Sequence, residues 1–331
     1  MPAISVIILN YNGRRWLSPC LDALAGQQGA PEFETILVDN GSSDDSASFV
    51  RTTYPLVRVI ETGNNLGFAA GNNAGSRAAR GDWLAFLNND TIADARWLGE
   101  LAREAAARPD CALVTSRLVY MDDPSIVDSA GDGYLRAGGA FKHGHGASAS
   151  AFTQSREVFG ACGGAFMIRR DAFEALGGFD PRFFMVYEDV DLSYRARLQG
   201  MRVWYAAGAV VRHAGSGSLG TVSAAAVFYG QRNLEWTWIK NTPRSLLLAT
   251  AVSHAIYSLA GVAHYVRIGR GGAALRGKWA ALRALPAVLK DRRRVQASRV
   301  ASASDLGPHM EPDWIAAKRR EKRFDSGRRQ A

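Results

Sequence analysis

Cysteine is scarce in this 331-residue chain, which contains Cys20, Cys111 and Cys162 and no others. Three widely spaced cysteines without a C-x-x-C pair exclude a zinc finger and a disulfide framework, and they favour a reducing compartment. The N-terminus lacks the basic start and cleavage site of an export signal, so we expect a protein that is not secreted. Hydrophobic residues make up 47% of the chain and charged residues 21%, which excludes a disordered chain.

Acidic residues are sparse at the C-terminal end. Residues 267–331 contain 17 Lys and Arg against 6 Asp and Glu, whereas residues 1–266 contain 23 against 25. The basic segment follows Ser245–Val266, a run of 22 residues without Asp, Glu, Lys or Arg. A basic segment beside an apolar one favours an anionic membrane surface as its partner. Nucleic acid is excluded because zinc-ligand spacing and interleaved aromatic and basic residues are missing from the rest.

The apolar run is long enough to cross a bilayer, but it is only mildly apolar because it contains two histidines and three serines. A span, an interfacial helix and an ordinary core helix all remain open readings. Beyond this run, one helical stripe flanked by basic residues comprises Leu275, Trp279, Leu282 and Leu289, and we expect Pro286 to bend that helix. We predict that residues 241–331 form a helical, basic, membrane-associating tail on the cytoplasmic side of the cell membrane, peripheral or monotopic.

Short β-branched runs alternate with helix-like stretches near the start of the chain. The predicted strands are Ile4–Leu9, Thr35–Val38, Leu56–Ile60 and Trp83–Leu87. The predicted helices between them are Trp16–Ala25, Asp44–Thr53 and Phe68–Arg80. This alternation predicts an α/β fold with a Rossmann-like, mainly parallel sheet.

Polar residues follow each of these four predicted strands. They include Asn10, Tyr11, Asn12, Asp39, Asn40, Asn65, Gly67, Asn88 and Asn89. Ligands of parallel sheets bind beyond the carboxyl ends of the strands, so we expect this edge to bind the ligand.

The second part of the fold is harder to read. We expect a helix at Arg96–Arg108, a strand at Ala112–Leu118, and a mobile glycine-rich loop at Gly131–Gly146. His143 and His145 lie in that loop without a nearby carboxylate, so a solvated loop is the preferred interpretation over a metal site.

Asp90 directly follows Asn88 and Asn89 at the mouth of a predicted strand. A carboxylate there can hold a hard divalent cation, Mg²⁺ or Mn²⁺, that binds a diphosphate. The alternative is ordinary turn chemistry. His213 lies just beyond a later predicted strand, Arg202–Val211, where imidazole can supplement a carboxylate at a Mn²⁺-type site. A satisfied histidine without a ligand is the alternative there.

Three carboxylates, Glu188, Asp189 and Asp191, stand at the start of a helix that the pattern predicts to continue to Gln199. The helix dipole tolerates acids there, so a capping cluster is one reading. The preceding Phe183–Tyr187 run is apolar and would desolvate the carboxylates, which raises a pKa as a general base requires. Catalysis by one of the three is the preferred reading.

Residues 215–220 match the dinucleotide pattern G-x-G-x-x-G, with Glu235 at the spacing of the ribose-binding acid. Glu235, however, lies in a helix-like stretch and not at the end of a second strand. We therefore reject the dinucleotide reading.

Together these motifs resemble glycosyltransferase family 2, inverting enzymes of GT-A fold, and within it the bacterial rhamnosyltransferase-like branch. The resemblance covers about residues 3–240. It rests on residues 6–13, 38–44, 64–75, 87–90, 177–180, 188–192 and 213. It implies a catalytic domain over 1–240, with a nucleotide-sugar half at about 1–92 and an acceptor half at about 93–240.

The resemblance also implies roles for single residues. Tyr11 packs on the nucleotide base, and Asp39 hydrogen-bonds the base or ribose. Asn72, in the motif over residues 64–75, is a further donor-binding residue. Asp90 is the main metal ligand and His213 approaches the metal, while Asn88 replaces the first acid of the family's D-x-D motif and suits a ribose or water-mediated contact. Asp189 matches the catalytic base.

The expected reaction is transfer of a sugar, such as rhamnose, from a dTDP- or UDP-sugar to a saccharide or polyprenyl-linked acceptor in cell-envelope polysaccharide synthesis. Direct displacement needs one base and one cation, and no carboxylate nucleophile. A non-catalytic nucleotide-sugar-binding scaffold at the membrane is the alternative.

Overall fold

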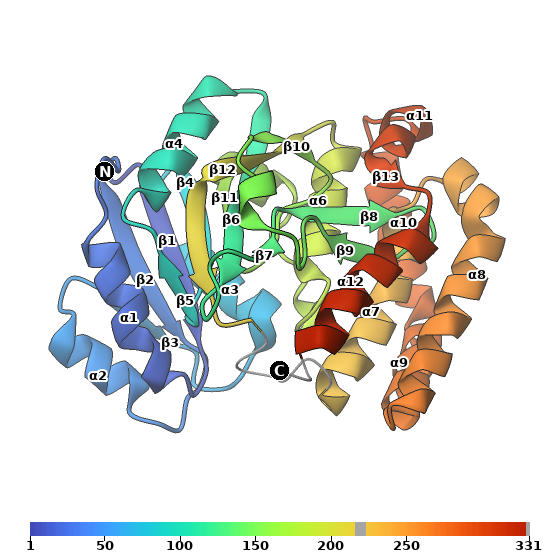
Figure 1. The fold of residues 1–331 in the computed structure, drawn as a ribbon, viewed down its shortest axis with the longest axis horizontal. Coiled ribbons are helices and arrows are strands. Elements are labelled where there is room, and N and C mark those ends of the chain that lie inside the picture. The colour runs from blue at the N-terminus through green and yellow to red at the C-terminus, as the bar shows by residue number, and fades with distance from the viewer. Residues whose placement is uncertain (216–222, 329–331) are drawn as a thin grey trace.

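A mixed sheet runs through the first two thirds of the chain in the computed structural model, which describes residues 1–215 and 223–328 (Figure 1). Neighbouring strands follow the order β10-β12-β6-β11-β4-β1-β2-β3. Their bounds are β1 (Ile4–Asn10), β2 (Phe33–Asp39), β3 (Arg58–Glu61), β4 (Trp83–Asn88), β6 (Cys111–Tyr120), β10 (Arg156–Val158), β11 (Ala165–Arg169) and β12 (Arg202–His213). Only β10 and β11 run antiparallel to their neighbours in this order. The prediction of a mainly parallel α/β sheet is confirmed.

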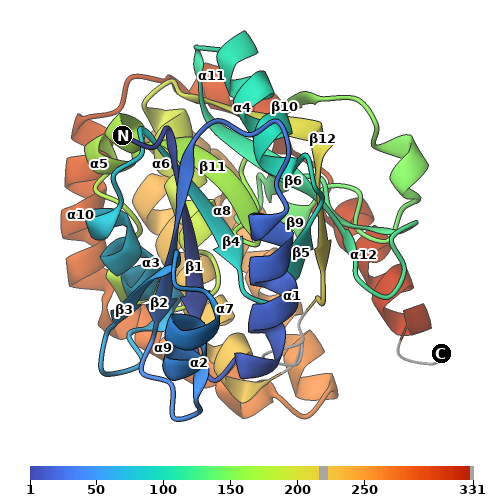
Figure 2. The ribbon, with the colours of Figure 1, turned by 90° about the vertical axis from the view of Figure 1, so that its left-hand side faces the viewer.

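Helices cover both faces of this sheet, as Figure 2 shows around β1. One face packs against α1 (Arg14–Ala25) and α4 (Trp97–Ala107), and α2 (Ser46–Thr53) lies beside β3. The other face packs against α3 (Gly67–Ala78), α5 (Arg170–Ala175) and α6 (Glu188–Leu198). The bounds of α1 to α4 lie within about two residues of the predicted ones, and α6 begins at Glu188 as predicted and ends at Leu198, one residue before the predicted end.

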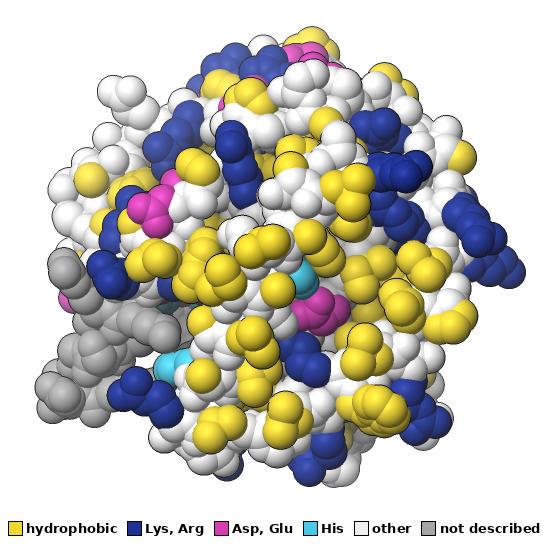
Figure 3. All heavy atoms as spheres, turned by 90° about the vertical axis from the view of Figure 1, so that its right-hand side faces the viewer, with side chains coloured by type: hydrophobic (Ala, Val, Ile, Leu, Met, Phe, Trp, Pro, Cys, Tyr) yellow, Lys and Arg dark blue, Asp and Glu magenta, His cyan; other side chains and the backbone are white. Residues whose placement is uncertain are grey.

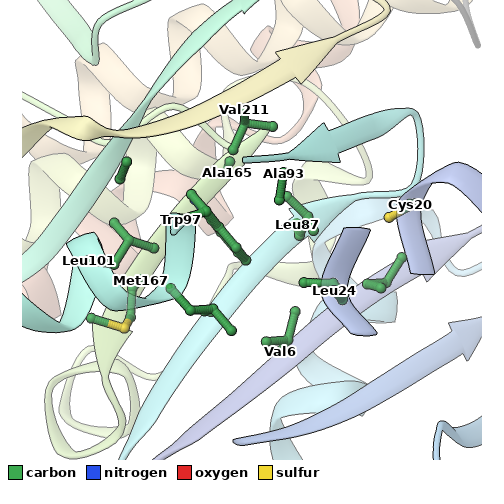
Figure 4. Packing of buried hydrophobic residues seen from close by; sticks show 14 of the residues in the cluster. Val6, Cys20, Leu24, Leu87, Ala93, Trp97, Leu101, Ala165, Met167 and Val211 are labelled. Atoms are coloured by element: carbon green, nitrogen blue, oxygen red, sulfur yellow. The ribbon is translucent and has the colours of Figure 1, made fainter. Parts of the chain in front are cut away.

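Side-chain alternation along β1 explains this two-sided packing. Ile4, Val6 and Ile8 point into the cluster with α1 and α4, whereas Ile7 belongs to the cluster with α3. Successive strand residues face opposite sides of a sheet, so an apolar run such as β1 is buried on both. Figure 4 shows Trp97 of α4 in the first cluster, where its indole nitrogen donates to the Ser116 hydroxyl at 2.8 Å.

The glycine-rich stretch is not a mobile loop, and that prediction is wrong. It contains β8 (Asp132–Leu135) and β9 (Ala140–Lys142), which form a small sheet with β13 (Met310–Glu311) in the order β13-β8-β9. Tyr134 and Leu135 are buried. The glycines serve the turns, since Gly131 and Gly138 have φ of 86° and 93°. The expectation of a solvated His143 and His145 is also wrong, because α12 (Trp314–Arg328) packs beside them.

The C-terminal part is helical, as expected, and lies at one end of the sheet (Figure 1). It comprises α7 (Ala224–Asn241), α8 (Arg244–Arg267), α9 (Gly271–Arg283), α10 (Leu285–Ala297), α11 (Ala303–Leu306) and α12. Helix α7 packs against α6, α9 and α10, and α8 packs on α9. The expected bend at Pro286 is a break between two helices, since Pro286 stands in the first turn of α10, where its missing N–H costs nothing.

Two further short strands bring site residues to the main sheet. Strand β5 (Thr91–Ala93) pairs with the end of β12 and aligns Thr91 with His213. Strand β7 (Val127–Ser129) pairs with the end of β6.

Candidate active site

The polar residues predicted to form one edge do lie together at the ends of β1, β2 and β4. The Asn89 amide donates to Asn10 Oδ1 at 2.7 Å, and the Asn10 amide lies 3.4 Å from Asp39 Oδ1. Asn10 and Asp39 are buried, whereas Tyr11, directly after β1, has 49% of its surface exposed. An exposed aromatic ring next to this polar edge can stack on a nucleotide base.

Two asparagine side chains shape the loops of this edge. Asn12 adopts a left-handed backbone with φ of 50° and accepts from the Ser43 backbone N–H at 2.7 Å. Asn40 accepts from the Leu66 N–H at 3.0 Å and donates to Asn65 Oδ1 at 3.1 Å. These bonds tie the loop after β2 to the loop before α3.

Two of the predicted donor-binding residues are turned to the protein interior or to the backbone. Asn72 is buried and donates to the Phe68 carbonyl at 3.0 Å within α3. Asn65 accepts from the Gly67 N–H at 2.9 Å and shapes the start of α3. Gly67 has φ of 79°, and a side chain there would collide with Phe184.

Asp90 and His213 meet where β5 pairs with β12. His213 Nε2 lies 3.5 Å from Asp90 Oδ1, and both side chains are buried. The Ala214 N–H donates to the Asp90 carbonyl at 3.0 Å and fixes the strand end beside them. The sequence predicted these two residues separately, and the pairing of β5 with β12 joins them.

Asp128 of β7 is a site residue that the sequence reasoning missed. His213 Nδ1 donates to Asp128 Oδ2 at 2.8 Å, and Lys142 donates to Asp128 Oδ1 at 2.7 Å. Burial alone would lower the pKa of His213, but hydrogen bonds to Asp128 and Asp90 raise it to about 9. No sequence motif marks Asp128, because β7 lies in a stretch without regular periodicity.

The donor set at Asp90 and His213 fits a divalent cation bound together with a substrate. Among the described residues no group of three or more His, Cys, Asp or Glu side chains is arranged to hold a metal alone. A carboxylate oxygen and an imidazole nitrogen 3.5 Å apart can both contact one ion. Diphosphate oxygens and water would complete the coordination, as is usual for Mg²⁺ at phosphate sites.

Asp189 lies in the first turn of α6, beside the segment that connects β10 to β11. Its Oδ2 accepts from the Gly163 N–H at 2.7 Å, and its Oδ1 accepts from the Val190 N–H at 2.8 Å. Burial raises the pKa of Asp189 above its ordinary value despite these backbone bonds. A carboxylate held by backbone and raised in pKa has the properties of a general base.

The two neighbouring acids have different environments. Asp191 has no exposed surface, and Lys240 Nζ lies 2.7 Å from its Oδ1. Burial would raise the pKa of Asp191, but the positive charges of Lys240 and Arg195 lower it below its ordinary value. This arrangement makes Asp191 a structural ion-pair partner that a substrate cannot reach. Glu188 is also buried, and burial together with Asp189 raises its pKa well above the ordinary value.

Asp132 of β8 is a second acid that the sequence reasoning missed. Its Oδ1 is buried without a hydrogen-bond partner in the described part of the chain. Burial raises the pKa of Asp132 well above its ordinary value, and the negative charge of Asp189 raises it further. It was missed because Gly131–Gly146 was read as a loop.

The rejected dinucleotide pattern falls mostly on residues 216–222, outside the described residues. Glu235 lies in α7, where it binds His254 and Lys278, and not at a strand end.

The family model described as Glycosyl transferase family 2 matches residues 5–177, more than half of the chain. The chain belongs to glycosyltransferase family 2. The resemblance inferred from the motifs is confirmed, and the matched residues include the strand ends from Asn10 to Asp90.

Two relatives of this glycosyltransferase illustrate the range of the family. The N-acetylglucosaminyl-diphospho-decaprenol L-rhamnosyltransferase of Mycobacterium tuberculosis is 30% identical over 234 residues, which cover 63% of this chain and 75% of that protein. The O-antigen biosynthesis protein RfbC of Myxococcus xanthus is 30% identical over 212 residues, which cover 61% of this chain. The matched region is only 16% of RfbC, a far longer protein.

Solved structures agree with the GT-A type of fold. The Pyrobaculum calidifontis mannosyltransferase PcManGT, in complex with GDP-Man and Mn²⁺, has a TM-score of 0.54 at 19% identity and covers 90% of this glycosyltransferase and 86% of its own chain. GalNAc-T7 with UDP, GalNAc and Mn²⁺ has a TM-score of 0.56 at 15% identity, over 80% of this chain and 57% of its own. At these identities the likeness concerns the fold.

Proposed function

We propose that this glycosyltransferase moves a sugar, such as rhamnose, with inversion from a dTDP- or UDP-sugar to a saccharide or polyprenyl-linked acceptor in cell-envelope polysaccharide synthesis. The main supporting observation is that the chain supplies two different groups from separate elements: the Asp189 carboxylate of α6, held by the Gly163 N–H and raised in pKa by burial, and the Asp90–His213 pair. The name of the mycobacterial relative supports a lipid-linked acceptor and a rhamnosyl donor.

The donor nucleotide binds over the ends of β1 and β2. Tyr11 stacks on the base, since its ring is exposed directly after β1, next to the buried Asn10. Asp39, held by Asn10 and the Ser42 N–H, accepts from the base or ribose. Asn88 and Asn89 at the end of β4 contribute neutral amides next to the diphosphate, where a second carboxylate would repel it.

Asp90 and His213 hold the divalent cation, Mg²⁺ or Mn²⁺. When bound, this cation supplies positive charge that stabilises the departing nucleoside diphosphate. The chain's own contribution is to orient the two ligands, and the bond from His213 Nδ1 to Asp128 directs Nε2 toward Asp90.

Asp189 accepts the proton of the acceptor hydroxyl as that oxygen attacks the anomeric carbon. Burial makes its carboxylate more basic than one in water, and the Gly163 N–H fixes one of its oxygens. Direct attack inverts the anomeric configuration, and no enzyme nucleophile is required.

The C-terminal helices dock this enzyme on the cytoplasmic side of the membrane as a peripheral or monotopic protein. By length and composition, α8 could span a bilayer. Its inner face, however, is bound to the domain: His254 is buried, donates to the Ala137 carbonyl at 2.9 Å and bonds Glu235 at 2.8 Å. A spanning helix would have to give up these bonds, so an interfacial position is favoured.

The outer surface of α8 to α10 is apolar and bordered by basic side chains, as the face in Figure 3 shows. We call it the apolar face. Its exposed members are Leu248, Val252, Ile256, Leu259, Val266, Ile268, Leu275, Trp279, Leu282 and Leu289. The basic residues along it, such as Arg276 and Arg283, suit anionic lipid headgroups. A lipid-linked acceptor would then reach the site from the bilayer surface.

A donor panel tests the proposed reaction. Purified protein receives dTDP-, UDP- and GDP-sugars with Mg²⁺ or Mn²⁺, and nucleoside diphosphate release and the anomeric configuration of the product are followed by NMR. We expect turnover of a dTDP- or UDP-sugar with inversion. Retention of configuration, or release unaffected by chelation of the cation, would contradict the proposal. Donor binding without turnover, with and without lipid acceptors, would favour the non-catalytic scaffold.

Vesicle sedimentation tests the membrane position. Full-length protein should sediment with vesicles of anionic phospholipid at low salt, and the triple variant Leu275→Ser, Trp279→Ser, Leu282→Ser should not. A wild-type protein that stays in solution would refute the docking.

A further inference from the structure

Three of the four residues in Phe184–Tyr187, the segment directly before helix α6, have unusual backbone geometry. The φ angles are 63° at Phe184, 66° at Val186 and 76° at Tyr187. These are three of the four non-glycine residues with positive φ in the described part of the chain. Aromatic and β-branched residues rarely adopt this conformation, and it persists only where surrounding contacts impose it.

One buried side chain supplies those contacts. The amide nitrogen of Asn233, on α7, lies within hydrogen-bond distance of three carbonyl oxygens, those of Phe183 at 3.0 Å, Met185 at 2.9 Å and Val186 at 2.7 Å, which share its two hydrogens. Asn233 has no exposed surface, and its Oδ1 accepts from Arg232 Nε at 2.9 Å. The amide nitrogen of Asn233 thus holds the backbone of this turn, and Arg232 holds the Asn233 side chain in place.

The turn held by Asn233 lies between the proposed base on α6 and the proposed donor-binding loop before α3. At one end the Tyr187 carbonyl accepts from the Asp191 N–H at 2.9 Å, so helix α6 and Asp189 begin directly from the turn. At the other end the Phe184 carbonyl accepts from the Ala69 N–H at 3.3 Å, at the start of α3 beside the donor loop. A change in the turn would therefore move the base relative to the donor.

We propose that Asn233 is a positioning residue that fixes the 183–187 turn and thereby the direction in which Asp189 faces the acceptor hydroxyl. This inference rests on the proposed function, in which Asp189 is the base. Asn233 cannot contact a substrate, because its side chain is fully enclosed. It acts through three backbone carbonyls.

The test compares Asn233→Ala with a matched control, Gln296→Ala. Gln296 also donates a side-chain amide to buried carbonyls, those of Asn241 at 2.8 Å and Lys240 at 3.4 Å, but it does not touch the turn. Hydrolysis of the donor chosen from the panel, in which water replaces the acceptor, reports on the base. For Asn233→Ala we expect kcat to fall about 10- to 100-fold with donor KM within about threefold, since small displacements of a reacting group have effects of this size.

Two further variants separate positioning from a general loss of stability. Asn233→Ser keeps one donor in a shorter side chain and should give an intermediate kcat, which also provides a milder variant if Asn233→Ala folds poorly. Adding Val186→Gly to Asn233→Ala should restore part of the lost kcat, because glycine adopts φ near 66° without strain.

The inference is overturned if Asn233→Ala keeps kcat within about threefold of wild type, or if Gln296→Ala loses as much kcat as Asn233→Ala. Asp189→Asn, measured in parallel, separates this inference from the proposed function. An active Asp189→Asn refutes the base itself, whereas an inactive Asp189→Asn beside a fully active Asn233→Ala refutes only the role of Asn233.

Discussion

Replacing Glu235 by glutamine should destabilise the protein, because Glu235 joins three C-terminal helices. From α7 its carboxylate bonds His254 Nε2 at 2.8 Å and the Ser258 hydroxyl at 2.9 Å, both on α8, and pairs with Lys278 on α9. Its side chain is 15% exposed, so solvent screening is limited. His254 in turn stacks on Trp238 with ring centroids 3.6 Å apart.

The pKa of Glu235 gives the size of the effect. Burial would raise it, but the bond to His254 and the charge of Lys278 lower it from 4.5 to about 2. A shift of this size corresponds to about 3 kcal/mol of folding free energy at neutral pH. Because the folded pKa is depressed, this contribution is present above pH about 4.5 and is lost as the pH falls toward 2.

Urea denaturation followed by tryptophan fluorescence measures this effect. At pH 7 Glu235→Gln should lower the free energy of unfolding by about 3 kcal/mol, and the difference from wild type should shrink progressively below pH 4.5. Glu32→Gln, at an exposed glutamate, serves as the control and should change stability by less than about 0.5 kcal/mol. A Glu235→Gln protein as stable as that control at pH 7 would refute the reasoning.

Four other variants test the site. Asp189→Asn should lower turnover by about 10²- to 10⁴-fold with little change in donor binding or melting temperature, and activity within threefold of wild type would exclude Asp189 as the base. Asp90→Ala should abolish the Mn²⁺-dependent part of nucleoside diphosphate binding in calorimetry and His213→Ala should reduce it, whereas equal wild-type affinity with and without Mn²⁺ would exclude the metal site. Asp128→Asn should weaken Mn²⁺ affinity about 10- to 100-fold through loss of the His213 bond, and unchanged affinity would show that Asp128 does not orient that histidine.

The strands and helices of the first ninety residues were predicted well from the sequence because short-range patterns mark them. Each predicted strand is a continuous apolar run, and each ends in turn-forming polar residues such as Asn10 or Asp39. Parallel pairing then has to bring those ends to one edge, so the prediction of a ligand-binding edge required no knowledge of the packing. The separate identification of Asp90, Asp189 and His213 likewise came from strand and helix boundaries.

The part of the chain after Thr91 could not be read in the same way. Gly131–Gly146 has the composition of a loop, yet pairing with Met310–Glu311, far away in the chain, makes β8 part of a sheet. The acids in and beside this stretch, Asp128 and Asp132, were missed for that reason. The three carboxylates of α6 also looked equivalent, and only Lys240 and Arg195 distinguish Asp191 as structural.

The sequence by itself determined the family, the mainly parallel sheet with its polar edge, and the basic helical C-terminal end, because apolar periodicity, turn residues and charge counts are properties of neighbouring residues. The tertiary structure decided which groups act together. Burial, and partners distant in the chain, raise the pKa of Asp189, join His213 to Asp128 and Asp90, and place Asn233 against the turn before the base. These depend on contacts between residues more than 25 positions apart, which no local pattern records.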